Sequence, residues 1–183
     1  NNKEAIFFRE GNFRYFLKEF DEYLSNLLDV YAFCLLPNHF HFLIRVKEDL
    51  TAFRNLEGHN ASNRNPVTQT FTNFFSTYTK AINKQQNRTG SLLQENLKRK
   101  LIDEEKYLTE IVFYIHNNPV HHNICKKLDE YVWSSYARIL NDRTSKLKKS
   151  EVLDWFGGKQ SFIEYHQLAL VDSKEAKKYL IED

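Results

Sequence analysis

Two histidines stand two residues apart, at positions 39 and 41, inside the mostly apolar segment Leu35–Ile44. Such a segment predicts a buried strand. Side chains alternate between the two faces of a strand, so His39 and His41 should share one face, roughly 6.5 Å apart along it. Two neutral imidazoles at this spacing suit the binding of one divalent cation. The alternative is a pair of hydrogen-bonded histidines in the core or at a sheet edge.

A tyrosine and an asparagine form the second group with chemical interest. Tyr107, Ile111, Tyr114 and Asn118 follow one another at spacings of four, three and four, which places them on one stripe of a predicted helix. A tyrosine hydroxyl, with an ordinary pKa near 10, can attack phosphorus when a cation disperses the developing charge. The amide oxygen of Asn118 would be a neutral third ligand that leaves positions for water and phosphate. By itself, the stripe is also typical of a core tyrosine and a helix-capping asparagine.

Basic residues form a third group, predicted to bind DNA phosphates. These are Lys84, Arg88, Lys98, Arg99 and Lys100. The last three lie between two leucines, and this mixture of basic and apolar residues predicts a strand that supports phosphate contacts. A solvated charged surface is the alternative interpretation.

Composition limits the class of protein. The chain has 183 residues, a hydrophobic fraction of 42% and a net charge of +2, which predicts a globular protein with a substantial core. Cys34 and Cys125 are too few for a disulfide framework. Cys34 is an odd number of residues from both histidines, so we expect it to face away from them as a buried residue. No apolar run approaches the roughly 20 residues of a membrane span and no signal peptide opens the sequence, which predicts a cytoplasmic protein without a membrane partner.

The histidines and the tyrosine must be positioned by alternating helices and strands. Apolar residues at helical spacing predict helices over 11–29 and 68–86. Two strands are expected over 30–36 and 39–46, joined by a tight turn, and the polar residues 47–66 are expected to form a connection.

A short extended segment is expected over 91–102. Asp103 is a suitable N-cap for the helix that carries the tyrosine stripe. That helix should end near Asn118, because Pro119 disfavours helical geometry in the residue before it. Short helices are expected beyond residue 141.

Four segments of this chain resemble the HUH single-tyrosine transposases, and three of them resemble the REP-associated branch of that family. In chain order they are Tyr31–Ile44, which holds the histidine–hydrophobic–histidine strand; Gly90–Gln94 followed by Lys98–Lys100; Tyr114–Val120; and Tyr131–Tyr136. Four ordered motifs are more specific than any one of them. The resemblance covers roughly residues 1–140, which it predicts to be the catalytic domain, and leaves 141–183 as a helical C-terminal extension.

The resemblance implies a fold, a site and a substrate. The implied fold is α+β and ferredoxin-like, with an antiparallel sheet and helices packed on one face. His39 and His41 would bind a divalent metal ion, Mg or Mn, and Asn118 would stand where the family places its third polar ligand. Tyr114 would be the nucleophile that forms a 5′-phosphotyrosine link. The implied substrate is single-stranded DNA folded into hairpins, cleaved and rejoined without a nucleotide cofactor. Related enzymes act as homodimers and as monomers.

Two other functions fit parts of the sequence. One is a domesticated, non-catalytic protein that binds hairpin or single-stranded DNA. The other is a small histidine–metal hydrolase unrelated to DNA, which the basic segment and the Tyr114–Asn118 pair disfavour. Family members usually have a further strand ahead of the segment that corresponds to Asn2 and Lys3, which this sequence does not include. Either residues ahead of Asn1 are missing, or the protein is a remnant with an incomplete sheet.

Overall fold

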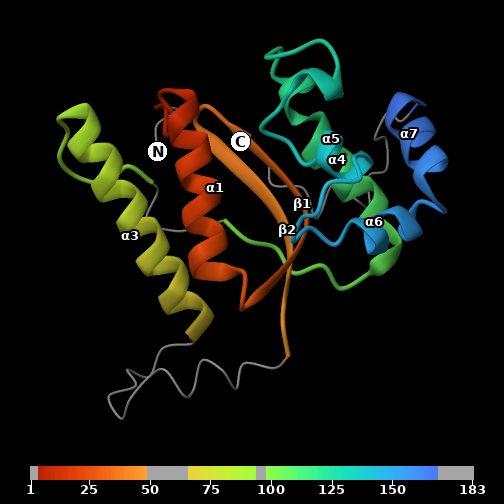
Figure 1. The fold of residues 1–183 in the computed structure, drawn as a ribbon, viewed down its shortest axis with the longest axis horizontal. Coiled ribbons are helices and arrows are strands. Elements are labelled where there is room, and N and C mark those ends of the chain that lie inside the picture. Colours follow the sequence, from red (N-terminus) through yellow and green to blue (C-terminus); the bar gives the residue numbers. More distant parts are fainter. Residues whose placement is uncertain (1–3, 49–65, 94–97, 169–183) are drawn as a thin grey trace. The chain divides into compact units, whose positions relative to one another are not determined.

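The computed structural model describes residues 4–48, 66–93 and 98–168. The protein is α+β, as predicted (Figure 1). In chain order the elements are α1 (Glu10–Leu24), β1 (Leu28–Leu36), β2 (His39–Val46), α3 (Pro66–Gln86), the 3-10 turn η1 (Glu105–Tyr107), α4 (Leu108–His121), the 3-10 turn η2 (Leu128–Glu130), α5 (Tyr136–Leu140), α6 (Lys149–Trp155) and α7 (Lys159–Leu168).

The described residues divide into two compact units. Unit 1 comprises those within Asn1–Asp29, Pro37–His39 and Arg45–Glu95, and unit 2 comprises those within Val30–Leu36, Phe40–Ile44 and Asn96–Asp183. The two-stranded sheet of β1 and β2 therefore contributes residues to both units. The predicted division into a catalytic domain over 1–140 and an extension over 141–183 stays a prediction.

Unit 1 consists mainly of α1 and α3, which lie side by side (Figure 1). Apolar residues at helical spacing give each helix one buried face, and aromatic rings fill the space between them. The ring centroid of Phe16 lies 4.9 Å from that of Phe74 and 5.0 Å from that of Tyr78, and both pairs of rings pack edge-on. Both helix predictions are confirmed, although α1 ends at Leu24, before the predicted end at residue 29.

The strands β1 and β2 form an antiparallel hairpin around Pro37 and Asn38, in agreement with the sequence. β1 also forms hydrogen bonds on its other edge. There the amide of Leu35 donates to the carbonyl of Trp133 at 3.0 Å, and the amide of Ser135 donates to the carbonyl of Phe33 at 2.9 Å. Residue 147 forms a further parallel bridge with Val30. β1 is therefore an interior strand, which accounts for its burial along most of its length.

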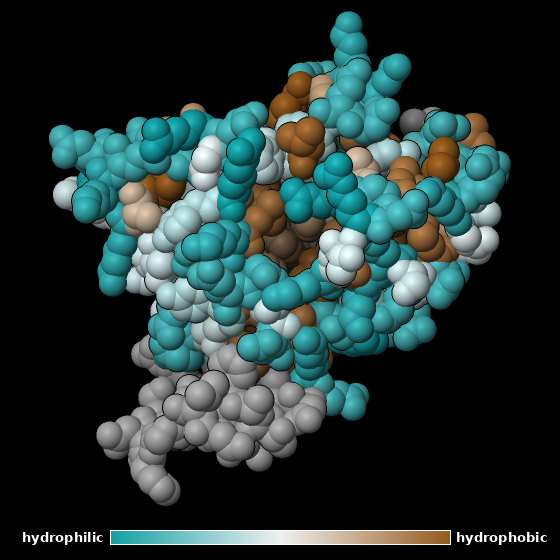
Figure 2. Space-filling view, viewed as in Figure 1, coloured by the Kyte–Doolittle hydropathy of each residue, from teal (hydrophilic) through white to brown (hydrophobic). Residues whose placement is uncertain are grey.

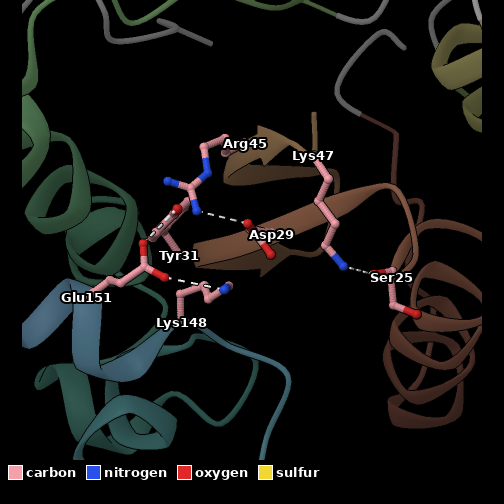
Figure 3. A network of polar contacts seen from close by, with 7 residues as sticks. All are labelled: Ser25, Asp29, Tyr31, Arg45, Lys47, Lys148 and Glu151. Carbon is pink, nitrogen blue, oxygen red and sulfur yellow. Dashed lines mark hydrogen bonds and ion pairs between the residues drawn. The ribbon is translucent and has the colours of Figure 1, made fainter. Parts of the chain in front are cut away.

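Unit 2 packs α4, α5, α6 and α7 with the middle of the hairpin (Figure 1). Figure 3 shows the polar contacts that hold α6 to β1. The hydroxyl of Tyr31 donates to a carboxylate oxygen of Glu151 at 3.0 Å, and the ammonium of Lys148 lies 3.3 Å from the other oxygen. Within unit 1, the same figure shows Arg45 paired with Asp29 at 3.0 Å. The short helices predicted beyond residue 141 are thus confirmed as α6 and α7.

The helix that carries the tyrosine begins and ends later than predicted. Asp103 is not its N-cap, because η1 intervenes and Tyr107 occupies the cap of α4. The predicted end near Asn118 is also wrong, since Pro119 lies inside α4, which continues to His121. The side-chain amide of Asn118 donates to the carbonyl of Tyr114 at 2.8 Å, which ties together the turn that precedes the proline.

The basic strand predicted within 91–102 is not formed by the described residues 91–93 and 98–102. Leu101 is 85% exposed, so the mixture of basic and apolar residues does not reflect a strand that buries one face.

On the face shown in Figure 2, hydrophilic side chains predominate and hydrophobic side chains appear in several small patches. Among the helices of the described ranges, none is both long and apolar enough to cross a membrane.

Candidate active site

His39 and His41 both lie on the predicted strand β2, two residues apart, and the alternation of a strand places their side chains on one face. His41 is 9% exposed and His39 is half-buried, and the Nε2 atom of each ring is shielded from solvent. The Nδ1 of His39 lies 2.8 Å from the side-chain oxygen of Asn38. Because an amide oxygen only accepts hydrogen bonds, this contact puts the proton on Nδ1 and the lone pair on Nε2.

Tyr114 and His41 come together within unit 2, although they are far apart in the sequence. The half-buried ring of Tyr114 packs edge-on against the imidazole of His41, with the ring centroids 5.6 Å apart and the planes at 78°. The predicted helical stripe explains this orientation: Ile111, Tyr114 and Asn118 are on α4, and Ile111 belongs to the unit 2 core. Tyr107, the first residue of the predicted stripe, lies in η1 instead.

Asn118 is one turn further along α4 and is 2% exposed. Its amide nitrogen is the donor to the carbonyl of Tyr114, at 2.8 Å. The bond therefore links the side chain of Asn118 to the backbone of the tyrosine residue. The amide nitrogen donates this hydrogen bond, so the amide oxygen is the atom of Asn118 that could coordinate a metal ion.

No three His, Cys, Asp or Glu side chains gather into a metal site in the part of the chain that the structure describes. Cys34 in particular is fully buried in the unit 2 core, and burial raises the pKa of its thiol. A thiol that stays protonated is a poor metal ligand. The two histidines could therefore hold an ion only together with other donors, such as an amide oxygen, water or phosphate.

The five predicted DNA-binding residues differ in their surroundings. Lys98, Arg99 and Lys100 are exposed residues of unit 2. In unit 1, Lys84 is exposed in the last turn of α3, whereas Arg88 is half-buried and lies 3.3 Å from a carboxylate oxygen of Glu4. The ion pair partly neutralises the guanidinium, so Arg88 is the weakest of the five candidates for a phosphate contact.

A buried polar cluster in unit 2 was given no role by the sequence. His116, Ser135 and His166 come from α4, from the segment ahead of α5 and from α7, and each is at most 6% exposed. Burial lowers the pKa of His166 to about 4 and the pKa of His116 well below its usual range, so both rings are neutral at pH 7. His116 and Ser135 lie inside two motifs that carry the family resemblance. The one sequence feature that could have indicated this cluster is a histidine on the apolar side of α4.

Comparisons with protein-family models, with curated proteins and with solved structures gave no match for this chain.

Proposed function

We propose that this chain is a metal-dependent transposase or nickase of the HUH single-tyrosine type. It cleaves and rejoins single-stranded, hairpin-bearing DNA through a 5′-phosphotyrosine intermediate. This reaction is a step of DNA transposition or recombination. The single observation that carries the proposal is the packing of Tyr114 against His41, with ring centroids 5.6 Å apart. A potential nucleophile and a potential metal ligand from separate elements thereby meet at one point of unit 2.

In the proposed reaction the hydroxyl oxygen of Tyr114 forms a bond to the phosphorus of a DNA phosphodiester, and the bond from phosphorus to the 3′ oxygen breaks. The tyrosine proton passes to solvent and the 3′ oxygen takes up a proton, so atoms and charge balance. The tyrosyl ester is again a phosphodiester, and a 3′ hydroxyl can reverse the step without a nucleotide cofactor.

His39, His41 and Asn118 are the residues proposed to hold the divalent ion, Mg²⁺ or Mn²⁺. When bound, such an ion disperses negative charge on the phosphate oxygens. The fit rests on the chemistry of the donors. The contact of His39 with Asn38 favours the tautomer with its lone pair on Nε2, as hydrogen bonds to the far nitrogen of a metal-binding histidine commonly do. Two imidazoles and one amide oxygen leave room for the substrate phosphate.

The DNA would be held mainly through its phosphates. Lys98, Arg99 and Lys100 are proposed as contacts because all three are exposed and adjacent, so they can follow a strand of DNA without first breaking a contact in the core. Lys84 is proposed as a further contact, and Arg88 as a weaker one because of its ion pair with Glu4.

The proposal includes a ferredoxin-like fold. The antiparallel hairpin supports it, as does the packing of α4 on one face of that hairpin. Alternate residues of β1 (Ala32, Cys34 and Leu36) share the unit 2 core with Ile111 and Ile115 of α4.

The test is the formation of a covalent protein–DNA adduct. The protein is incubated with a panel of hairpin-bearing oligonucleotides and Mn²⁺ or Mg²⁺ and then analysed on a denaturing gel. Tyr114→Phe should abolish the adduct and leave DNA affinity unchanged, since affinity comes mainly from phosphates and stacked bases. Tyr107→Phe, the matched control in η1, should form the adduct at the rate of the unaltered protein. Adduct that persists in Tyr114→Phe would contradict the proposal.

The second candidate is a non-catalytic protein that binds hairpin or single-stranded DNA. The observation in its favour is that His41 is only 9% exposed, which restricts the approach of a phosphate to that ring. The exposed Lys98–Lys100 segment would serve such a protein equally well. DNA binding without adduct from the unaltered protein, with every hairpin and metal ion, would favour this second function.

A further inference from the structure

A continuous chain of hydrogen bonds crosses the interior of unit 2. The Nε2 of His116 lies 2.7 Å from the hydroxyl oxygen of Ser135, and its Nδ1 lies 2.9 Å from the Nε2 of His166. The Nδ1 of His166 in turn lies 2.8 Å from the carbonyl oxygen of Phe162. His116 and Ser135 are fully buried. The chain therefore connects α4 to α7 on one side and to the segment ahead of α5 on the other.

The carbonyl oxygen of Phe162, at one end of the chain, determines which atom donates in each of the hydrogen bonds. A carbonyl only accepts, so His166 donates from Nδ1 to Phe162 and accepts at Nε2. His116 must then donate from Nδ1 to His166, which leaves its own Nε2 as an acceptor. The hydroxyl of Ser135 supplies the proton for that acceptor at 2.7 Å, in preference to the carbonyl oxygen of Phe33, which lies 3.2 Å from the same hydroxyl oxygen. Both imidazoles are neutral in this arrangement, in keeping with the lowered pKa values of both rings.

Ser135 also joins the chain to the sheet. Its hydroxyl oxygen accepts a hydrogen bond from the backbone amide of Phe33 at 2.9 Å, and its own amide donates to the carbonyl of Phe33 at 2.9 Å. Phe33 lies on β1, the strand that pairs with β2. The path from β1 through Ser135 to His116 thus consists of directional bonds between buried atoms.

This path of hydrogen bonds links α4, which carries Tyr114, to β1, which is paired with the strand that carries His41. His116 is two residues after Tyr114 on α4, and β1 is hydrogen-bonded to the strand that holds His41. Tyr114 and His41 meet through a ring contact, and a ring contact by itself sets distance and rotation loosely. The hydrogen bond between His116 and Ser135 restrains the rotation and the axial position of α4 against the sheet far more narrowly.

We propose that His116 and Ser135 are positioning residues, whose hydrogen bond holds the hydroxyl of Tyr114 at the distance and angle from His41 that attack on a phosphodiester requires. The catalytic part of this inference rests on the proposed function. The positioning itself is a property of the fold and can be measured without DNA.

The first comparison uses two neighbouring buried serines. Ser135→Ala removes the donor to His116. Ser134→Ala removes a buried hydroxyl of the same size, which accepts a hydrogen bond from the backbone amide of Tyr136 at 3.2 Å. In the protein labelled at tyrosine and histidine, the nuclear Overhauser effect between the rings of Tyr114 and His41 reports their contact. We expect Ser135→Ala to weaken or broaden it and Ser134→Ala to leave it unchanged.

A second pair of variants separates the two bonds of His116. A glutamine amide reaches about as far as Nε2 and can still accept from Ser135, whereas an asparagine amide takes roughly the place of Nδ1 and can only reach His166. His116→Gln should therefore keep the contact between Tyr114 and His41, and His116→Asn should lose it. This pair tests the inference even if Ser135→Ala does not fold, because both variants replace the same buried ring by an amide.

The kinetic readout is the rate of adduct formation at saturating hairpin oligonucleotide and Mn²⁺. Ser135→Ala and His116→Asn should lower this rate roughly 10- to 100-fold, the effect of a small misplacement of a reacting group, without changing DNA affinity. An unchanged ring contact and an unchanged rate in both variants would overturn the inference. Absence of adduct from the unaltered protein would instead overturn the proposed function, since the ring contact tests the positioning independently.

Discussion

The cores of the two units are built from different interactions. In unit 1, α1 and α3 meet mainly through aromatic rings, with Phe16 in contact with Phe7, Phe74 and Tyr78. In unit 2, the core includes a hydrogen-bonded chain of two histidines and a serine. Ring packing contributes a large apolar area but tolerates small shifts, whereas hydrogen bonds constrain individual atoms to a few tenths of an ångström. The candidate nucleophile belongs to the unit with the directional core.

The largest expected effect concerns the aromatic core of unit 1. Phe16 is fully buried, so Phe16→Ala should lower the free energy of unfolding by about 3–5 kcal/mol through lost contacts and a cavity. Amide hydrogen exchange should show this loss in α1 and α3, by the same amount at pH 7 and pH 5, because the lost contacts are apolar. Phe8→Ala, at a 43% exposed position, is the control and should cost much less. A loss that grew at pH 5 would contradict the distinction between the two cores.

The next effect is an acid dependence specific to unit 2. Unfolded histidine takes up a proton near pH 6.5, whereas His166 does so only at a pKa of about 4 because it is buried. Between these values the unfolded state binds more protons, so the free energy of unfolding falls as the pH drops from about 6.5 and levels off below about 4. His166 alone accounts for a loss of about 3 kcal/mol, and the fully buried His116 adds to it.

This acid dependence is measured as hydrogen exchange of the β1 and α4 amides against pH. The rings and titratable side chains packed around His166 are His116, Tyr136, Tyr165, Phe113, Phe156 and Phe162. None of them is charged at pH 5 to 7, so the desolvation of the ring dominates. His166→Gln should flatten the dependence, and His121→Gln, at an exposed position on the same helix as His116, should leave it intact. An equally steep profile in His166→Gln would remove His166 as the cause.

The smallest effect compares the basic residues of the two units. Replacing Lys98, Arg99 and Lys100 together by Ala should lower the slope of log affinity against log salt by roughly 2 on single-stranded DNA, the value for three phosphate contacts. Lys84→Ala in unit 1 should lower it by roughly 0.7, the value for one contact. Fluorescence anisotropy titrations at several salt concentrations measure both slopes. A slope unchanged by the triple substitution would show that the Lys98–Lys100 segment is merely solvated.

Local patterns in the sequence predicted much of the secondary structure. Period-two burial around the histidines identified the hairpin, and helical spacing identified α1 and α3. The strand predicted from the mixture of basic and apolar residues is not formed by residues 98–101, because such a mixture gives a strand only where a neighbouring strand buries one side, and Leu101 is 85% exposed. The end of α4 differs from the prediction because a proline only disfavours helical geometry in the residue before it, and here both Asn118 and Pro119 are buried within a helix that continues to His121.

The candidate site was predictable in part. The spacing of His39 and His41 and the place of Tyr114 on its helix follow from strand and helix periodicity alone. The contact between Tyr114 and His41 is a tertiary one, suggested in advance by the complementary chemistry of the two groups and by the family resemblance but not by periodicity. The polar chain had no such signal, since its bonds join residues 19 and 50 positions apart. A buried histidine can be suspected from the apolar face that carries it, but its partners are fixed by packing.

The interior position of β1 also sets an order of events during synthesis. Its bonds to the serine hydroxyl span 102 residues of sequence, and its tyrosine contact to α6 spans 120. At 5–20 residues per second, a ribosome delivers the first of these partners roughly 5–20 s after the strand itself. Throughout that interval an apolar strand has one unprotected edge, a state that favours aggregation and chaperone binding. Translation speed across residues 37–135 therefore decides how long the nascent chain depends on protection by other proteins.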